Sequence, residues 1–229
     1  MGGGNHRKQG EVLRALRGAM QSIAVYTLYP PDLRAPQPSR NTSPMDGRGA
    51  DWMSALLALG RLGMRDEFRA VMARLVPDLI DYRVNEVAGL LVPEFVHQNR
   101  SGATWGLNTM QESDGTIRCA AMLAAMMQEP LPFVLCLEEP ELAIHVGALP
   151  VLVDQILVTS TLTTVFVTTH SPDLIDLVPS ACVRVVVRED EGTEVRAVDG
   201  LQQEAVRRQL ATMGTLLREE GLRAGTSGG

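Results

Sequence analysis

The segments PFVLCLEEPELAIH (residues 132–145) and TVFVTTHSP (residues 164–172) decide the fold that we expect for this chain. Each begins with a short apolar run and ends abruptly in polar groups: the first run ends in Glu138 and Glu139, and the second in a Thr-Thr-His sequence that closes with His170. A short apolar run without polar alternation is typical of a strand buried on both faces of a parallel sheet. Ligands bind at the carboxyl ends of such strands. We therefore expect a functional site where these polar groups lie.

The two adjacent glutamates predict a division of labour. Neighbouring side chains at a strand end point in different directions, so Glu138 can face a metal ion while Glu139 orients or deprotonates a water molecule. Hydrolysis of a Mg–nucleotide needs both functions. The alternative is a solvated turn that leads into a helix, whose amino terminus favours Glu. His170 ends the neighbouring strand and is placed to contact a phosphate near Glu139, with a purely structural histidine as the alternative.

A third motif precedes both strands. Ser113, Asp114 and Gly115 form a turn that opens a helix expected over residues 116–128. Free backbone N–H groups and the helix dipole at such a place bind anions. An ordinary N-cap formed by Ser113 or Asp114 is the alternative interpretation.

The remaining pattern predicts an α/β fold: a mostly parallel sheet flanked by helices, with an α-helical insertion at about residues 50–78. We expect three regions, namely a flexible segment over 1–21, a core over 22–200, and a helix and tail over 201–229. The other expected elements are a helix at 11–20, a strand at 22–29, a loop at 31–49, helices at 52–62 and 68–75, a β-hairpin of 80–87 and 90–96, a loop at 98–106, a helix at 141–158 that carries His145, a short helix at 172–177, a hairpin of 183–188 and 195–198, and a helix at 202–220.

Composition narrows the class of protein. With 229 residues, 45% of them hydrophobic, the chain has room for one substantial α/β domain. The net charge of −6 provides no global basic field for nucleic acid, which leaves only a local patch for DNA. The three cysteines lie far apart in apolar runs, as expected for reduced thiols. No run approaches the about 20 apolar residues of a membrane span. We expect a cytoplasmic protein without a membrane partner.

The ordered series of motifs resembles the ABC-type ATPases of the RecF/SMC/OLD-like branch, and most closely the prokaryotic AAA family ATPases of that branch. The series is Ser-Asp-Gly-Thr at 113–116, an apolar strand with Glu-Glu-Pro-Glu–x3-His, and a second apolar strand with Thr-Thr-His-Ser-Pro. The resemblance covers roughly residues 22–199. It implies a P-loop NTPase fold, ATP and Mg²⁺ as cofactors, and either a homodimer or a partner chain that carries a P-loop.

The resemblance also implies a role for each motif. Ser113–Gly115 matches the signature motif, which in this family reaches across a head-to-head dimer to the γ-phosphate of the partner's ATP. Glu138 matches the Walker B carboxylate near Mg²⁺, which is commonly Glu in this branch. Glu139 matches the catalytic glutamate that polarises the attacking water, and His170 matches the switch histidine that senses the γ-phosphate.

One departure from the family is large. A P-loop has the pattern G-x-x-x-x-G-K-[ST], whose backbone amides and lysine hold the phosphates, but the only lysine of this sequence is Lys8, followed by Gln9. The sequence therefore corresponds to the family's C-terminal two-thirds, as expected for a truncated reading frame or a half-protein completed by another chain. Phosphoryl transfer depends on positioning and electrostatics, so we expect negligible ATPase activity from this chain alone. Without its first lobe, we also expect an exposed sheet edge.

Two other classes of function stay open. The chain can be a non-catalytic module that supplies a signature motif in trans to a P-loop protein, in which case it should co-purify with one. It can also be a metal-dependent hydrolase that uses Glu138, Glu139, His145 and His170, for which tightly held Zn²⁺ or Mn²⁺ would be the sign.

Overall fold

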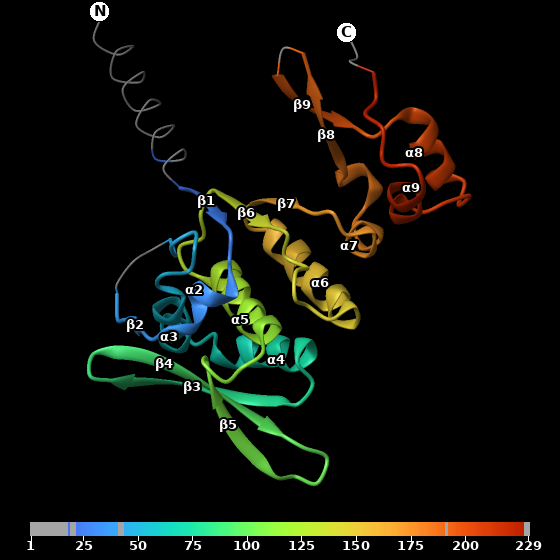
Figure 1. Ribbon diagram of the computed structural model, residues 1–229. Coiled ribbons are helices and arrows are strands. Elements are labelled where there is room, and N and C mark those ends of the chain that lie inside the picture. Colours follow the sequence, from blue (N-terminus) through green and yellow to red (C-terminus); the bar gives the residue numbers. More distant parts are fainter. Residues whose placement is uncertain (1–17, 19–21, 41–43, 191, 227–229) are drawn as a thin grey trace, which may run out of the picture. The chain divides into compact units, whose positions relative to one another are not determined.

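The computed structural model describes residue 18 and residues 22–40, 44–190 and 192–226 (Figure 1). The expected flexible segment at 1–21 and the helix expected within it at 11–20 lie outside the described residues, apart from Gly18. The chain divides into two compact units, Met1–Thr168 and Thr169–Gly229. We refer to them as the first and the second unit.

The first unit contains the expected parallel sheet. Its strands are β1 (Ile23–Tyr26), β6 (Val134–Glu138) and β7 (Thr164–Thr168), in the order β1-β6-β7. Both pairings are parallel, with Val25 opposite Cys136 and Cys136 opposite Phe166. Segments that are far apart in the sequence thus end at one edge of the sheet.

An antiparallel sheet forms the other layer of the first unit. It consists of β2 (Gln37–Pro38), β3 (Leu79–Val87), β4 (Leu90–Gln98) and β5 (Thr104–Asn108). The predicted hairpin of β3 and β4 is confirmed. The predicted loop at 98–106 is wrong in its second half, because Thr104 and Trp105 begin β5 and pair with Gln98 and His97 of β4. Thr and Trp favour strands, and the ladder of β4 offers them a partner.

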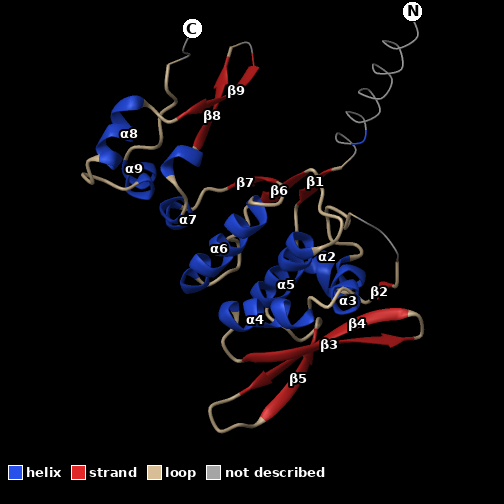
Figure 2. Cartoon of the chain, turned by 180° about the vertical axis from the view of Figure 1, so that it is seen from behind, coloured by secondary structure: helices blue, strands red, loops and turns tan. Residues whose placement is uncertain are grey.

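Helices fill the space between the two sheets. They are α2 (Pro30–Arg34), α3 (Trp52–Arg61), α4 (Arg65–Leu75) and α5 (Asp114–Met127), and Figures 1 and 2 show α3, α4 and α5 between the sheets. The helices predicted at 52–62, 68–75 and 116–128 are confirmed. Helix α2 falls in the expected loop at 31–49, because proline at the first helical positions is favourable for a helix start. Every residue of α5 from Thr116 to Met127 is buried, as expected for a central helix that is apolar all round.

Among the described residues of the first unit, only one face of the parallel sheet is covered, so the expected burial of the strands on both faces is wrong. Tyr26 and Leu137 point into the core that α5 and α6 (Leu149–Ser160) also form. On the opposite face Ile23, Val25 and Phe166 are 48%, 47% and 60% exposed. The alternation of the strands is invisible in the sequence because the exposed positions are also apolar. The exposed sheet face comprises Ile23, Val25, Val134, Cys136 and Phe166.

The connection between β6 and β7 also differs from the expectation of a helix over 141–158. Glu139 and Ala143 adopt left-handed backbone conformations, with φ of 42° and 62°. A 3₁₀ turn, Val146–Ala148, follows, and α6 begins only at Leu149. Pro150 explains the late start, because proline is tolerated in the first turn of a helix but not in its interior. His145 therefore lies before the helix.

The second unit contains α7 (Pro172–Leu177), a 3₁₀ turn at Ser180–Cys182, a hairpin of β8 (Arg184–Glu189) and β9 (Gly192–Ala197), and helices α8 (Gly200–Arg207) and α9 (Met213–Glu219). The predicted short helix and hairpin are confirmed. The single helix predicted at 202–220 is wrong: Gln209 has a φ of 58° and ends the first segment, and Thr212 caps the second by accepting a hydrogen bond from the Thr215 N–H. None of the helices in the described part of the chain is long and apolar enough to cross a bilayer.

Candidate functional site

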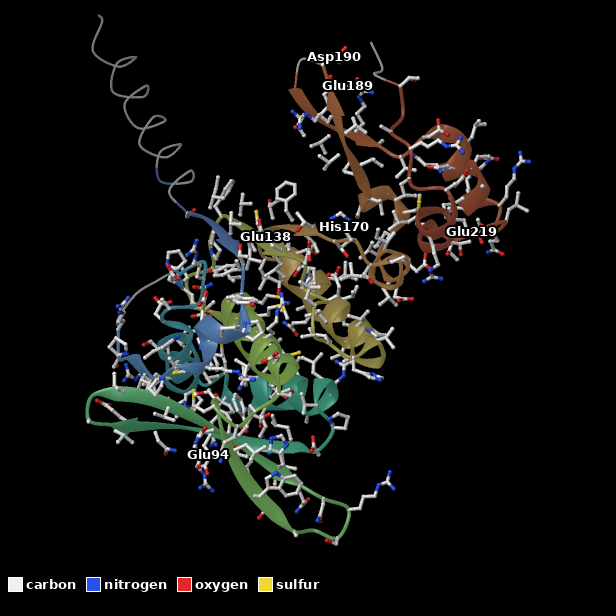
Figure 3. All side chains as sticks on the ribbon, in the orientation of Figure 1. Glu94, Glu138, His170, Glu189, Asp190 and Glu219 are labelled. Atoms are coloured by element: carbon white, nitrogen blue, oxygen red, sulfur yellow. The ribbon has the colours of Figure 1, made fainter. Side chains whose placement is uncertain are left out.

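Three polar side chains follow one another across the carboxyl ends of the parallel strands. Glu138 ends β6 and pairs in register with Thr168 at the end of β7, while Thr27 directly follows β1. The Thr27 hydroxyl donates a hydrogen bond to Oε2 of Glu138 at 2.5 Å. Because side chains alternate along a strand, these three lie on the same side as the exposed sheet face, and Figure 3 shows Glu138 at the end of β6. We call them the carboxyl-end row.

The backbone of Glu139 is strained and held from two sides. Its φ of 42° is uncommon for a residue with a side chain, and a left-handed conformation costs roughly 1–2 kcal/mol. Its N–H donates to the carbonyl of Thr168 at 2.9 Å. Its own carbonyl accepts a hydrogen bond from Nη2 of Arg118 at 3.0 Å. Strained residues of this kind persist only where surrounding contacts over-determine them, so the turn after β6 has a defined shape.

Arg118 links the central helix to this turn. Arg118 is only 4% exposed, and its guanidinium donates hydrogen bonds to the carbonyls of Glu139 and Leu142, each at 3.0 Å. Burial lowers the pKa of Arg118, while the nearby Cys119, Glu141 and Glu139 act in the opposite direction. A buried charge needs such partners. Arg118 therefore ties α5 to the segment that carries both glutamates.

A cavity opens beside the carboxyl-end row. It has a volume of about 390 Å³ and is lined by Thr27, Leu28, Tyr29, Arg118, Glu138, Glu139, Leu142 and Thr168. A larger cavity of about 740 Å³ lies at the amino ends of the same strands, but none of its lining residues is titratable. The chemistry-bearing groups thus belong to the smaller cavity.

The turn at Ser113–Gly115 starts α5. Ser113 is the N-cap, and its hydroxyl oxygen accepts a hydrogen bond from the Thr116 N–H at 3.0 Å. Asp114 pairs with Arg34 at 2.5 Å. Gly115 packs so closely on the turn after β6 that an added Cβ would lie 2.4 Å from the carbonyl oxygen of Ala143. The expected anion-binding turn and the expected carboxylate turn are therefore in direct contact within the first unit.

The two histidines have different surroundings. His145 begins the 3₁₀ turn, and its Nδ1 accepts a hydrogen bond from the Gly147 N–H at 3.0 Å. His170 is exposed and lies in the second unit, directly before Ser171, the N-cap of α7. Within the described residues no group of three or more His, Cys, Asp or Glu side chains could hold a metal ion, so the hydrolase alternative has no assembled ligand set there.

Two residues of this region escaped the sequence analysis. Thr27 carries no motif of its own, and only the register of β1 against β6 brings it to Glu138. Arg118 did leave a signal, because it is the only charged residue among the apolar positions of the helix over 116–128. Charged side chains are almost never fully buried unless paired, so a lone arginine in such a helix points to a buried partner.

A family model described as "AAA domain, putative AbiEii toxin, Type IV TA system" matches residues 54–176, which is more than half of the chain. The chain belongs to this AAA-domain family. The matched span includes α5 with its preceding turn, both glutamates and His170. Family membership supports a general ATPase-domain function. No curated protein matches the sequence.

Solved structures agree with the expected fold. The AAA-family chain is similar to a chain from a structure described as "Structural biochemistry of ATP-driven dimerization and DNA stimulated activation of SMC ATPases", with a TM-score of 0.50 and 13% identity over 68% of this chain and 96% of that chain. It is also similar to an Smc head domain with a coiled coil from Pyrococcus yayanosii, with a TM-score of 0.49 and 14% identity over 66% of this chain and 29% of that chain. The first of these likenesses confirms a P-loop NTPase-like fold of a parallel sheet flanked by helices.

Proposed function

We propose that this AAA-family chain supplies part of an ATP-binding and ATP-hydrolysing site, with Mg²⁺ as the metal ion. The observation that carries the proposal is the carboxyl-end row, in which Glu138 is oriented by Thr27 beside the strained and doubly held Glu139. Carboxylates at the carboxyl ends of parallel strands are placed to meet a ligand. Hydrolysis of ATP depends chiefly on such positioning.

The two glutamates take different roles in this proposal. Glu138 would hold Mg²⁺, because its carboxylate is exposed and a hydroxyl fixes one of its oxygens. Glu139 would orient the attacking water, since its backbone is fixed from both sides and it lines the cavity. His170 would sense the γ-phosphate. When bound, Mg²⁺ supplies neutralisation of the phosphate charge.

The signature turn would act on a second molecule. Ser113–Gly115, at the amino terminus of this chain's α5, would approach the γ-phosphate of an ATP that a partner chain holds. Arg34 supports this role because it neutralises Asp114, whose negative charge would otherwise repel the phosphate. The contacts of Gly115 and Arg118 with the turn after β6 would pass a displacement of one motif to the other.

The partner would carry the P-loop that this sequence lacks. We propose that it covers the exposed sheet face, which is apolar and runs directly into the carboxyl-end row. A lobe seated there would bring its phosphate-binding groups to Glu138. This arrangement also includes the simpler possibility that the chain only completes the ATP site of its partner.

The first test is Mg–ATP binding and phosphate release by the purified chain. We expect no measurable turnover and no tight binding by calorimetry, because no P-loop holds the phosphates. Addition of a P-loop-bearing polypeptide that co-purifies with the chain should restore turnover, and Glu139→Gln should remove it. Turnover by the pure chain that Glu139→Gln abolishes would contradict the need for a partner. Persistent inactivity of a complex with bound ATP would contradict hydrolysis.

Alkylation of cysteines tests where the partner binds. Cys136 lies on the exposed sheet face and is half-buried. Burial raises the pKa of its thiol, and the negative charge of Glu138 raises it further. At neutral pH we expect iodoacetamide to modify Cys136 more slowly than the exposed Cys182, because the thiolate is the reactive form. The rate at Cys136 should rise about tenfold per pH unit while the pH stays below its pKa.

A bound P-loop partner should protect Cys136 and leave Cys182 of the second unit unchanged as the control. Cys119, whose pKa burial raises to about 12, should stay unmodified in both states. Equal modification of Cys136 with and without the partner would show that the partner binds elsewhere.

A further inference from the structure

A buried histidine lies between two carboxylates beside the signature turn. His97 of β4 is 4% exposed, and its Nε2 is hydrogen-bonded to Oε1 of Glu112. Its Nδ1 lies 3.3 Å from Oδ2 of Asp78, a contact without hydrogen-bond geometry. Trp105 of β5 stacks on the imidazole with ring centroids 5.7 Å apart. The imidazole of His97 therefore contacts Asp78 directly before β3, Trp105 of β5, and Glu112 directly before the signature turn.

Glu112 carries the contact to the signature turn. The residue is 5% exposed, and its second oxygen, Oε2, accepts a hydrogen bond from the Ser113 N–H at 3.0 Å. A buried acceptor that loses its hydrogen-bond partner is left with its full desolvation cost, which exceeds the net gain of the bond. Both oxygens of Glu112 are thus committed, one to the sheet and one to the start of α5.

The position of the Ser113 peptide determines the geometry of the signature turn, because Ser113 is the N-cap of α5. Ser113 has the extended conformation of an N-cap, with φ of −68° and ψ of 149°. This conformation directs its hydroxyl to the Thr116 N–H. A shift of the Ser113 peptide would therefore move the cap and the following Asp114 and Gly115 together.

We propose that His97 and Glu112 are positioning residues that hold Ser113, Asp114 and Gly115 against the antiparallel sheet. The proposal rests on the proposed function of this turn in contacting a γ-phosphate. Neither residue lines the cavity at the carboxyl-end row, so both act through Ser113. A movement of the antiparallel sheet would then reach the signature turn through one buried hydrogen-bonded pair, His97 and Glu112.

Hydrogen–deuterium exchange of the full chain without nucleotide tests the proposal. Glu112→Met keeps a side chain of similar length and removes both oxygens, so the contacts with His97 and with the Ser113 N–H are both lost. His97→Phe keeps a ring against Trp105 and removes both nitrogen contacts. We expect each variant to raise the exchange rate of the amides at 113–117 about tenfold, while amides of α6 keep the wild-type rate. Asp81→Asn, which breaks an exposed pair with Arg65 in the same sheet, is the control and should change neither region.

The double variant decides whether the two residues act as one unit. If they do, exchange at 113–117 in the double variant should not exceed that of the stronger single variant. Wild-type exchange at 113–117 in Glu112→Met would overturn the proposal, as would an additive double variant. Uniform loss of protection throughout the first unit, or failure to fold, would make the pair a general stabilising element and also overturn it. Because no nucleotide is present, a failure of the proposed ATP chemistry would leave these outcomes unchanged.

Discussion

Replacement of Arg118 by methionine is expected to lower the free energy of unfolding of the first unit by about 3 kcal/mol. Two hydrogen bonds from a charged donor are lost, each worth about 1.5–3 kcal/mol. The Leu142 carbonyl loses its Arg118 contact, and the Glu139 carbonyl keeps the bond from the Leu142 N–H at 3.2 Å. Methionine restores part of the packing through its flexible apolar side chain. The left-handed turn at Glu139 should loosen at the same time, because one of the hydrogen bonds that hold its backbone is removed.

Urea unfolding followed by tryptophan fluorescence measures this effect. Both tryptophans, Trp52 and Trp105, belong to the first unit, so the signal reports that unit alone. Arg74→Met is the matched control: its pair with Asp154 is exposed, and its loss should change the stability by less than about 0.5 kcal/mol. Equal effects of the two variants would mean that the contacts of Arg118 with the turn after β6 do not stabilise the unit.

Replacement of Gly115 by alanine should destabilise the first unit by about 2 kcal/mol, as overpacking of a filled site usually does. Helix propensity alone predicts the opposite sign, because alanine is about 1 kcal/mol better than glycine inside a helix. The contact with the Ala143 carbonyl decides the outcome, since a new Cβ at 2.4 Å forces α5 away from the turn after β6. The same urea titration measures the change.

Gly60→Ala provides the control for the backbone term. Gly60 is in α3, and no atom lies within 4 Å of the position where its Cβ would be placed. This variant should stabilise the unit by about 0.5–1 kcal/mol. If both variants stabilise the protein, the close approach of α5 to the turn after β6 does not exist in solution.

Local pattern was sufficient for most of the elements. The N-cap preference of Ser113 located the start of α5, and the abrupt polar ends of two apolar runs located the ends of β6 and β7. These features depend on residues that are close in the sequence. The proposed roles of Glu138 and Glu139 stay predictions, although the parallel sheet places both at one edge.

Features that depend on neighbours in space were not predictable. The apolar runs of β6 and β7 predicted strands that are buried on both faces, because Cys136 and Phe166 are also apolar, yet Phe166 is 60% exposed. Strand β5 forms because β4 offers it a hydrogen-bonding edge. The prediction of a helix over 141–158 did not take into account that Pro150 fits only the first turn of a helix, and α6 begins at Leu149. The turn that replaces the first part of the expected helix is held by contacts with α5.

The sequence by itself determined which reactive groups stand at strand ends and helix starts, since chain-local periodicity and capping decide those positions. Only the tertiary structure decided what holds them. Thr27 meets Glu138 across 111 residues, Arg118 meets Glu139 across 21, and His97 meets Glu112 across 15. These partners come together through strand register and the packing of α5, which no short window of sequence contains.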